Sequence, residues 1–218
     1  MLFDIDGTLI STGGASDRAW HRAFLELQGV EVNVPDYTGK GVPDPAVGLQ
    51  CFRGAIGREP EGEEMARLMA LRERYLREEV ETSPGYRVMP GAEPLLERLT
   101  GEGRLVGLIT GNTKPAARIK LARAGLNHFF AFGGYGSDAD ERADVARKAL
   151  ERADAASWGR LDRAACIATG DTPLDVAAGH AAGIRVVGVA TGEYSVEDLR
   201  AAGGDWVVAS LADDALPF

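Results

Sequence analysis

The chain has 218 residues, of which 45% are hydrophobic and 26% are charged, a composition typical of a globular protein and not of a disordered or fibrous one. Its 33 acidic and 24 basic residues give a net charge of −9, which argues against nucleic acid as the main partner. No apolar stretch approaches the roughly 20 residues that cross a bilayer, and no basic leader precedes the first acidic residues. We therefore expect a cytoplasmic protein without a membrane partner, with Cys51 and Cys166 as reduced thiols.

The first predicted element is a short strand, Met1–Phe3, that leads into the run D-I-D-G-T-L. Gly7 supplies the backbone freedom for a sharp exit from this strand. Asp4 and Asp6 are therefore expected at the mouth of the strand. Three residues make a short strand compared with the usual length of about five or six, so we expect the native chain to begin upstream of Met1.

A helical segment follows this strand and is predicted to be an insertion. Residues Ala15–Gln28 place apolar side chains at helical spacing, which is typical of an amphipathic helix. A loop rich in glycine and proline spans residues 35–45, and a further helical stretch ends near Arg53. Glu63–Val80 predicts a long surface helix with a solvated charged face. Together these patterns predict a helical cap over residues 14–85.

From Val88 onward, short apolar runs alternate regularly with helical patterns, and such alternation predicts a parallel sheet. The predicted strands are Leu105–Thr110, Phe130–Phe132, Ala165–Thr169, Arg185–Val189 and Trp206–Val208. The predicted helices are Ala92–Thr100, Ala116–Ala124, Arg142–Ala153, Thr172–Ala182 and Ser195–Ala202. The predicted fold is α/β: a Rossmann-like parallel sheet core of residues 1–13 and 86–218 with an inserted α-helical cap of residues 14–85.

Three polar clusters follow predicted strands. Asp4 and Asp6 form the first, Thr110-Gly111-Asn112 the second, and Asp171 with Asp175 the third. Open α/β sheets bind ligands at the carboxyl ends of their strands. Crowded carboxylates are costly unless a hard cation neutralises them, and Mg²⁺ combines carboxylates with waters and a phosphate oxygen. The sequence therefore predicts a magnesium site that receives phosphate.

These motifs resemble those of the haloacid dehalogenase (HAD) superfamily, and especially its phosphatases with a helical cap. Asp4 and Asp6 match the D-x-D-G-T signature, Thr110 matches the second motif, and Asp171 with Asp175 matches G-D-x-x-x-D. The resemblance covers essentially the whole chain. It implies a HAD-like core and a Mg²⁺-dependent phosphomonoester hydrolase, similar to phosphoglycolate phosphatases.

The resemblance also implies roles for the acidic residues. Asp4 would attack the phosphorus to give an aspartyl phosphate that water hydrolyses, and Asp6 would act first as acid and then as base. A carboxylate with an unperturbed pKa of about 3.9 is ionised near neutral pH, so the nucleophile needs no general base. Asp4, the backbone carbonyl of Asp6 and Asp171 would bind the metal, with Asp175 as an outer ligand.

Phosphoryl transfer also requires donors and a cation around the phosphate. Thr110 and the backbone amides around Gly111 and Asn112 are the expected donors. The family's usual Lys-Pro pair is missing between Phe132 and Ala165, and Arg142 matches an arginine variant of that motif. Lys148 and Lys114 are the alternative cations.

The resemblance places the loop with Lys40 and Asp44 over the site, where both would bind the leaving group; a plain surface turn is the alternative.

The expected partner is a small phosphorylated metabolite, with phosphoglycolate as the guess, and the chain is expected to be a monomer or homodimer. Capping and turn formation are the alternative roles of the four aspartates.

Three other functions compete with this hypothesis. A sugar phosphomutase shares the aspartate pair and differs in how its cap excludes water. A 2-haloacid dehalogenase is disfavoured because carbon–halogen cleavage needs neither Asp6 nor a metal. A catalytically silent HAD-like regulatory module is disfavoured because all the expected acids are present.

Overall fold

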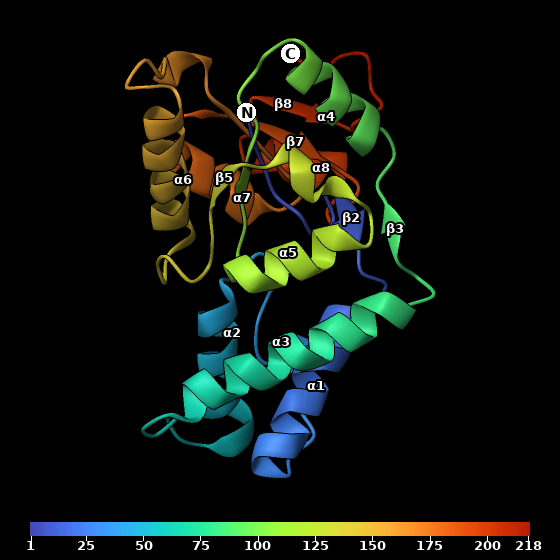
Figure 1. Ribbon diagram of the computed structural model, residues 1–218, viewed down its shortest axis with the longest axis vertical. Helices are drawn as coiled ribbons and strands as arrows, with labels where there is room; N and C mark the ends of the chain where they lie inside the picture. Colours follow the sequence, from blue (N-terminus) through green and yellow to red (C-terminus); the bar gives the residue numbers. More distant parts are fainter.

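The computed structural model describes residues 1–218 and contains a six-stranded, fully parallel sheet (Figure 1). Its strands are β1 (Leu2–Phe3), β4 (Gly107–Ile109), β5 (Phe132–Gly134), β6 (Ile167–Gly170), β7 (Arg185–Val189) and β8 (Trp206–Val208). They lie side by side in the order β5-β4-β1-β6-β7-β8. The sheet therefore grows outward from β1 in both directions, and the predicted α/β fold is confirmed.

Helices cover both faces of this sheet because its central strands are apolar on both sides. Phe3 packs with Leu96 and Leu121 on one face, whereas Leu2 packs with Val145 on the other. The first face carries α4 (Ala92–Gly101), α5 (Lys114–Ala122) and the short turn η3 (Leu126–Phe129). The second carries α6 (Arg142–Ala156), α7 (Pro173–Ala181) and α8 (Val196–Ala201), with the turn η4 (Arg163–Ala165) before β6. None of the helices is long and apolar enough to cross a membrane.

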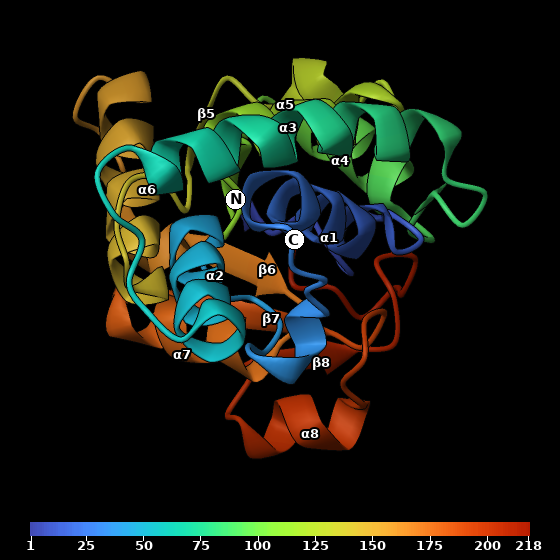
Figure 2. The same ribbon diagram turned by 90° about the horizontal axis from the view of Figure 1, so that it is seen from below.

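The remaining helices gather at one end of the molecule, beyond the carboxyl ends of the strands (Figures 1 and 2). They are α1 (Ala15–Gln28), η1 (Val34–Asp36), α2 (Asp44–Cys51), the π-helical turn η2 (Phe52–Ile56) and α3 (Glu64–Thr82). Trp20, Phe24, Phe52 and Leu68 belong to a cluster of buried side chains within these elements. The helical segment therefore has an apolar core of its own, and this explains why it stands apart from the sheet.

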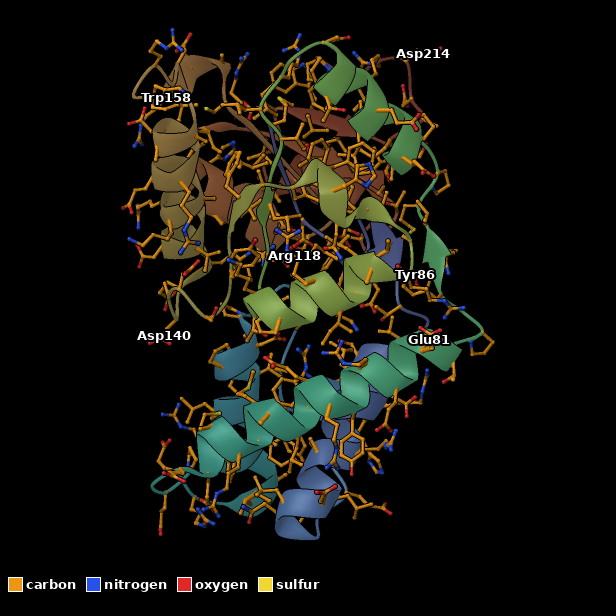
Figure 3. The ribbon with its side chains drawn as sticks, in the orientation of Figure 1. Glu81, Tyr86, Arg118, Asp140, Trp158 and Asp214 are labelled. Carbon is orange, nitrogen blue, oxygen red and sulfur yellow. The ribbon has the colours of Figure 1, made fainter.

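Two chain crossings join the helical segment to the sheet. There β2 (Ile10–Ser11) pairs antiparallel with β3 (Arg87–Val88), and Figure 3 shows Glu81 and Tyr86 on either side of the second crossing. Gly13 has a φ of 60°, and a Cβ there would lie 2.4 Å from the carbonyl carbon of Gly85. The two connecting segments therefore contact each other at Gly13 and Gly85, because a side chain at Gly13 would clash with the backbone of Gly85.

The observed strand β5 begins later than predicted. Phe130, expected as the first strand residue, is instead buried at the end of η3. The strand itself contains Gly133 and Gly134, where a Cβ would lie 2.8 Å from Leu108 Cβ and 2.1 Å from the carbonyl oxygen of Val145. Close packing against β4 and α6 thus requires residues that strand propensity disfavours.

Candidate active site

The carboxyl ends of β4, β1 and β6 lie side by side at the point where the strand order reverses. Open α/β sheets bind ligands at such a point. Asp4 follows β1, Thr110 follows β4 and Asp171 follows β6. A cavity of about 670 Å³ lies between these strand ends and the helical segment, and Lys40 and Lys120 also line it. The candidate site is therefore a chamber shared by the two parts of the chain.

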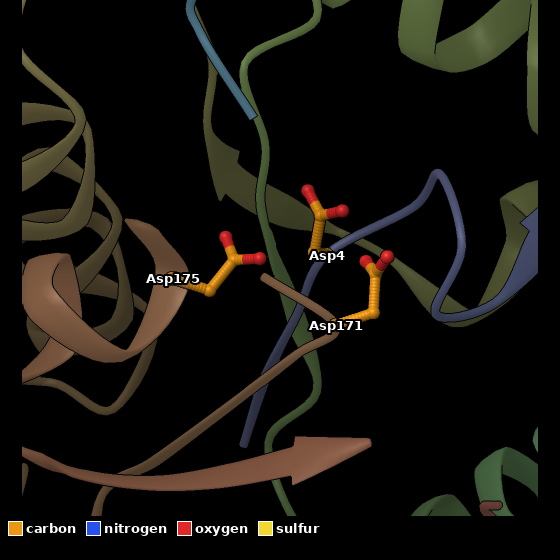
Figure 4. Close-up of side chains that lie close together, drawn as sticks. All are labelled: Asp4, Asp171 and Asp175. Carbon is orange, nitrogen blue, oxygen red and sulfur yellow. The ribbon is translucent and has the colours of Figure 1, made fainter. Parts of the chain in front are cut away.

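Three buried carboxylates meet at the floor of this chamber. Figure 4 shows the side chains of Asp4, Asp171 and Asp175 gathered there, and one oxygen from each lies within 4.8 Å of the others. Burial raises the pKa of Asp4 to about 7, with Arg142 opposing the rise and Asp175 adding to it. Burial, together with the charges of Asp175 and Asp4, raises the pKa of Asp171 to about 9. The cluster therefore favours additional positive charge.

Asp171 is the carboxylate of this cluster that forms no ion pair. Its Oδ1 accepts a hydrogen bond from Thr8 Oγ1 at 3.1 Å. Its Oδ2 lies against the backbone, because a Cβ at Gly7 or Gly192 would come within 2.2 or 1.8 Å of that atom. Gly7 also has a φ of 81°, so both space and backbone conformation require glycine there.

Asp175 differs from Asp171 because both of its oxygens are engaged. Its Oδ1 accepts from Arg142 Nη2 at 2.6 Å. Its Oδ2 accepts from the backbone nitrogen and hydroxyl of Thr172 at 3.2 and 2.7 Å, which completes a capping box at the start of α7. A metal ion at this cluster would therefore find free carboxylate oxygens on Asp4 and Asp171, with Asp175 behind them.

Arg142 is the cation at this cluster. Its Nη2 donates to Asp4 Oδ1 and to Asp175 Oδ1, each at 2.6 Å, and the residue is 3% exposed. Although burial acts against it, the charges of Asp175 and Asp4 raise the pKa of Arg142. By contrast, Lys148 pairs with Glu151 on the exposed side of α6, and Lys114 is exposed at the start of α5.

Thr110, Gly111 and Asn112 form the loop that follows β4. The side-chain amide of Asn112 donates to Thr110 Oγ1 at 2.8 Å and to Asp6 Oδ2 at 2.7 Å. A Cβ at Gly111 would lie 3.0 Å from Arg142 Nη1 and 2.7 Å from the carbonyl oxygen of Val42. The loop therefore lies between the acidic cluster and the helical segment.

The two side chains predicted to bind the leaving group have different environments. Lys40 is half-exposed and lines the chamber, with Nζ 3.4 Å from Glu193 and 4.0 Å from Asp17. Asp44 is 6% exposed; it pairs with Arg72 and accepts a hydrogen bond from the backbone nitrogen of Thr113 at 2.8 Å. Lys40 therefore lines the chamber with a partly exposed side chain. The carboxylate oxygens of Asp44 already bind Arg72 and Thr113.

The residue that sequence reasoning missed is Lys120. Its Nζ donates to both carboxylate oxygens of Asp6, at 2.8 and 2.7 Å, from a position that is 2% exposed. Although burial opposes the change, Lys120 and Asn112 lower the pKa of Asp6. One signal in the sequence indicates its position: Lys120 lies four residues after Ala116 and next to Leu121, on the apolar stripe of α5.

Comparisons with known proteins agree on one family. The sequence model of the haloacid dehalogenase-like hydrolase family matches residues 1–183 of this chain. A phosphoglycolate phosphatase of Cereibacter sphaeroides is 31% identical over 190 residues, which cover 85% of this chain and 82% of that protein.

Solved structures show the same fold. CbbY from Rhodobacter sphaeroides, determined in complex with phosphate, has a TM-score of 0.76 at 19% identity and covers 97% of this chain and 94% of its own. A beta-phosphoglucomutase from Clostridium difficile has a TM-score of 0.73 at 20% identity, with 97% and 90% covered. Because proteins of different activity share this fold, the side chains in the chamber must decide the function.

Proposed function

Because this chain belongs to the haloacid dehalogenase-like hydrolases, we propose that it hydrolyses a small organic phosphate monoester with Asp4 as nucleophile and Mg²⁺ as cofactor. The protein is a phosphatase. One observation carries the proposal: Asp4 holds one oxygen against Arg142 at 2.6 Å and lies beside the unpaired carboxylate of Asp171. This arrangement combines a nucleophile, a fixed cation and an open acidic position in one place.

The residues present fit a divalent cation. Hard cations such as Mg²⁺ prefer carboxylate and carbonyl oxygens, and Asp4 and Asp171 would supply such oxygens together with the backbone carbonyl of Asp6. Asp175 would act behind them by fixing Arg142. When bound, the ion would offset the negative charge of the carboxylates and of the phosphoryl group.

Asp4 would carry the covalent step. Oriented by its hydrogen bond from Arg142, the carboxylate of Asp4 attacks the phosphorus through one oxygen, a bond from this oxygen to phosphorus forms, and the phosphorus–oxygen bond to the leaving group breaks. Water then cleaves the aspartyl phosphate and releases inorganic phosphate. Arg142, Thr110 and the backbone amides of Gly111 and Asn112 would stabilise the phosphoryl oxygens as negative charge redistributes.

Asp6 would transfer the protons of both steps. Its side chain is 40% exposed and lines the chamber beside Asp4. It would donate a proton to the departing alkoxide and later take one from the attacking water. The helical segment would cover the chamber during transfer and open for release.

The substrate we propose is a small monophosphate of the phosphoglycolate type. The name of the relative from Cereibacter sphaeroides supports this class. A sugar phosphomutase must also bind the second phosphate of a bisphosphate, which calls for uncompensated cations away from Asp4. Lys40, on the helical side of the chamber, already has Glu193 and Asp17 as neighbours, whereas Arg87 also lines the chamber and forms no ion pair. The mutase is therefore the second candidate, and the name of the relative is what favours a monophosphate.

A panel of small phosphate esters, assayed for phosphate release with and without Mg²⁺, tests the proposal. We expect release that EDTA abolishes and Mg²⁺ restores, with a small carboxylated ester among the best substrates. A stable phosphoenzyme that a bisphosphate stimulates would favour the mutase instead. No release from any ester would favour a silent regulatory module.

A further inference from the structure

Lys120 is a buried cation whose ion pair is not explained by the steps described above. Its Nζ donates to Asp6 Oδ1 at 2.8 Å and to Oδ2 at 2.7 Å. Its side chain is 3% exposed, and Asp6 is the only carboxylate with which it forms an ion pair. Both residues line the same chamber. The positive charge therefore faces the reacting centre but has a single partner.

That partner has a second task in the proposed reaction. Lys120 contacts both oxygens of Asp6, and Asn112 contacts one of them. Proton transfer to the leaving group requires an oxygen of Asp6 to turn toward the ester oxygen. When it turns, Lys120 loses contacts at a site where an unpaired charge is costly. A negative group next to the ester oxygen of the substrate would replace those contacts.

From this arrangement we infer that Lys120 recognises a carboxylate carried by the leaving group one carbon from the ester oxygen. The inference rests on the proposed function and makes Lys120 the residue that determines specificity for carboxylated monoesters. On binding, the substrate carboxylate accepts hydrogen bonds from Lys120 Nζ, and Asp6 is free to face the ester oxygen. Recognition of the correct leaving group thereby prepares the acid.

The other cations of the chamber are less suited to this role. Arg142 is divided between Asp4 and Asp175 on the floor. Lys40 belongs to the helical segment and has Glu193 and Asp17 as neighbours. Arg87 lines the chamber from the exposed strand β3 and forms no ion pair with Asp4 or Asp6. Lys120 alone pairs with the carboxylate that must face the leaving group, so a substituent close to the ester oxygen would meet this cation.

Two substrates of matched length test the inference: 2-phosphoglycolate, and 2-hydroxyethyl phosphate, which replaces the carboxylate by a neutral alcohol. We expect the unmodified protein to show a higher kcat/KM for 2-phosphoglycolate. Lys120→Met is expected to lower kcat/KM for 2-phosphoglycolate by about 10- to 100-fold more than for 2-hydroxyethyl phosphate, because a charge-assisted hydrogen bond is lost. Lys120→Arg, which keeps the charge, is expected to retain much of the preference.

Lys148→Met is the matched control, since Lys148 is exposed and pairs with Glu151 on α6; it is expected to leave both values unchanged. Should Lys120→Met fail to fold, Lys120→Gln keeps a donor near Asp6 without the charge and allows the same comparison. An equal loss for both substrates would mean that Lys120 only positions Asp6, and would overturn the inference.

Equal kcat/KM values for the two substrates in the unmodified protein would overturn the inference without any variant. In that case the phosphatase function would stand, because phosphate is still released from both esters. Release from neither ester nor from any other would remove the proposed function and, with it, this role for Lys120. The two failures are therefore distinguishable.

Discussion

The backbone nitrogen of Thr113 donates a hydrogen bond to Asp44 Oδ2 across 2.8 Å, so the first residue of α2 holds the loop that follows β4. The same carboxylate pairs with Arg72 of α3, with Nη1 2.9 Å from Oδ2 and Nη2 3.0 Å from Oδ1. Asp44 also donates its own N–H to the carbonyl oxygen of Gly111 at 2.7 Å. Two helices beyond the sheet are thereby joined to the loop proposed to bind phosphate.

Asp44→Ala is expected to destabilise the protein strongly. Arg72 is 0% exposed, and loss of its partner leaves a buried guanidinium without a counter-charge, at a cost of about 3–5 kcal/mol. Asp44→Ala combined with Arg72→Met should recover most of this loss, because the unpaired charge is then absent. Urea unfolding of the single and double variants measures both effects.

Arg74→Ala provides the control for this cycle, since Arg74 of α3 pairs with Glu26 on the exposed surface. Its effect should stay within about 1 kcal/mol. If Asp44→Ala were no more destabilising than Arg74→Ala, the buried ion pair would not have the structural role described here.

Asp4→Asn is expected to abolish turnover while leaving the fold intact. The amide keeps the shape of the side chain but is not a nucleophile, so kcat should fall at least roughly a thousandfold. Stability without metal should be equal or higher, because burial raises the pKa of Asp4 and so disfavours its charged form. Phosphate release and thermal unfolding measure the two effects, with the exposed Asp140→Asn as control; phosphate release at the normal rate would refute the mechanism.

Asp171→Asn is expected to remove the response to Mg²⁺. An ion that binds only the folded state raises its stability with concentration, so MgCl₂ should raise the Tm of the unmodified protein and leave that of the variant nearly unchanged. Without Mg²⁺ the variant should be at least as stable, because burial and the charges of Asp175 and Asp4 already disfavour ionised Asp171. An equal rise in Tm for both proteins would argue against Asp171 as a ligand.

Much of the fold and the acidic part of the site could be predicted because local patterns encode them. Alternating apolar runs and helical spacing predicted the parallel sheet, and the carboxyl ends of neighbouring parallel strands meet by geometry. Asp4, Thr110 and Asp171 each follow such a strand directly. Their proximity thus depends on strand order alone, and the structure places β4, β1 and β6 side by side.

The contacts that come from other elements could not be predicted in this way. Helical spacing places Lys120 on the apolar stripe of α5, but it does not say which residue of the sheet lies opposite. Lys120 reaches Asp6 only because α5 packs with this stripe toward the sheet. Arg72 and Asp44 pair across two helices, and nothing in either local sequence specifies the partner. In β5 the packing of Gly133 against Leu108 prevailed over strand propensity.

The stability of the loop before α6 is expected to depend on pH through Asp138. Its carboxylate accepts hydrogen bonds from Arg152 at 2.6 and 2.8 Å and from the backbone nitrogen of Tyr135 at 2.9 Å. Although partial burial opposes the change, these donors lower the pKa of Asp138. The stabilisation is therefore present above the unfolded-state pKa of about 3.9 and is lost as pH falls through the lower folded-state pKa.

Asp138→Asn should accordingly reduce the free energy of unfolding by about 1 kcal/mol near neutral pH, since Arg152 is partly exposed and water screens the pair. The difference in free energy of unfolding between the unmodified protein and the variant should narrow below about pH 4, because the carboxyl of Asp138 then takes up a proton. Urea unfolding across this range measures the difference. Asp144→Asn, which removes an exposed partner of Arg147, should produce only a small change. A difference for Asp138→Asn that stays constant down to about pH 3 would show that shape and hydrogen bonding, not charge, give Asp138 its effect.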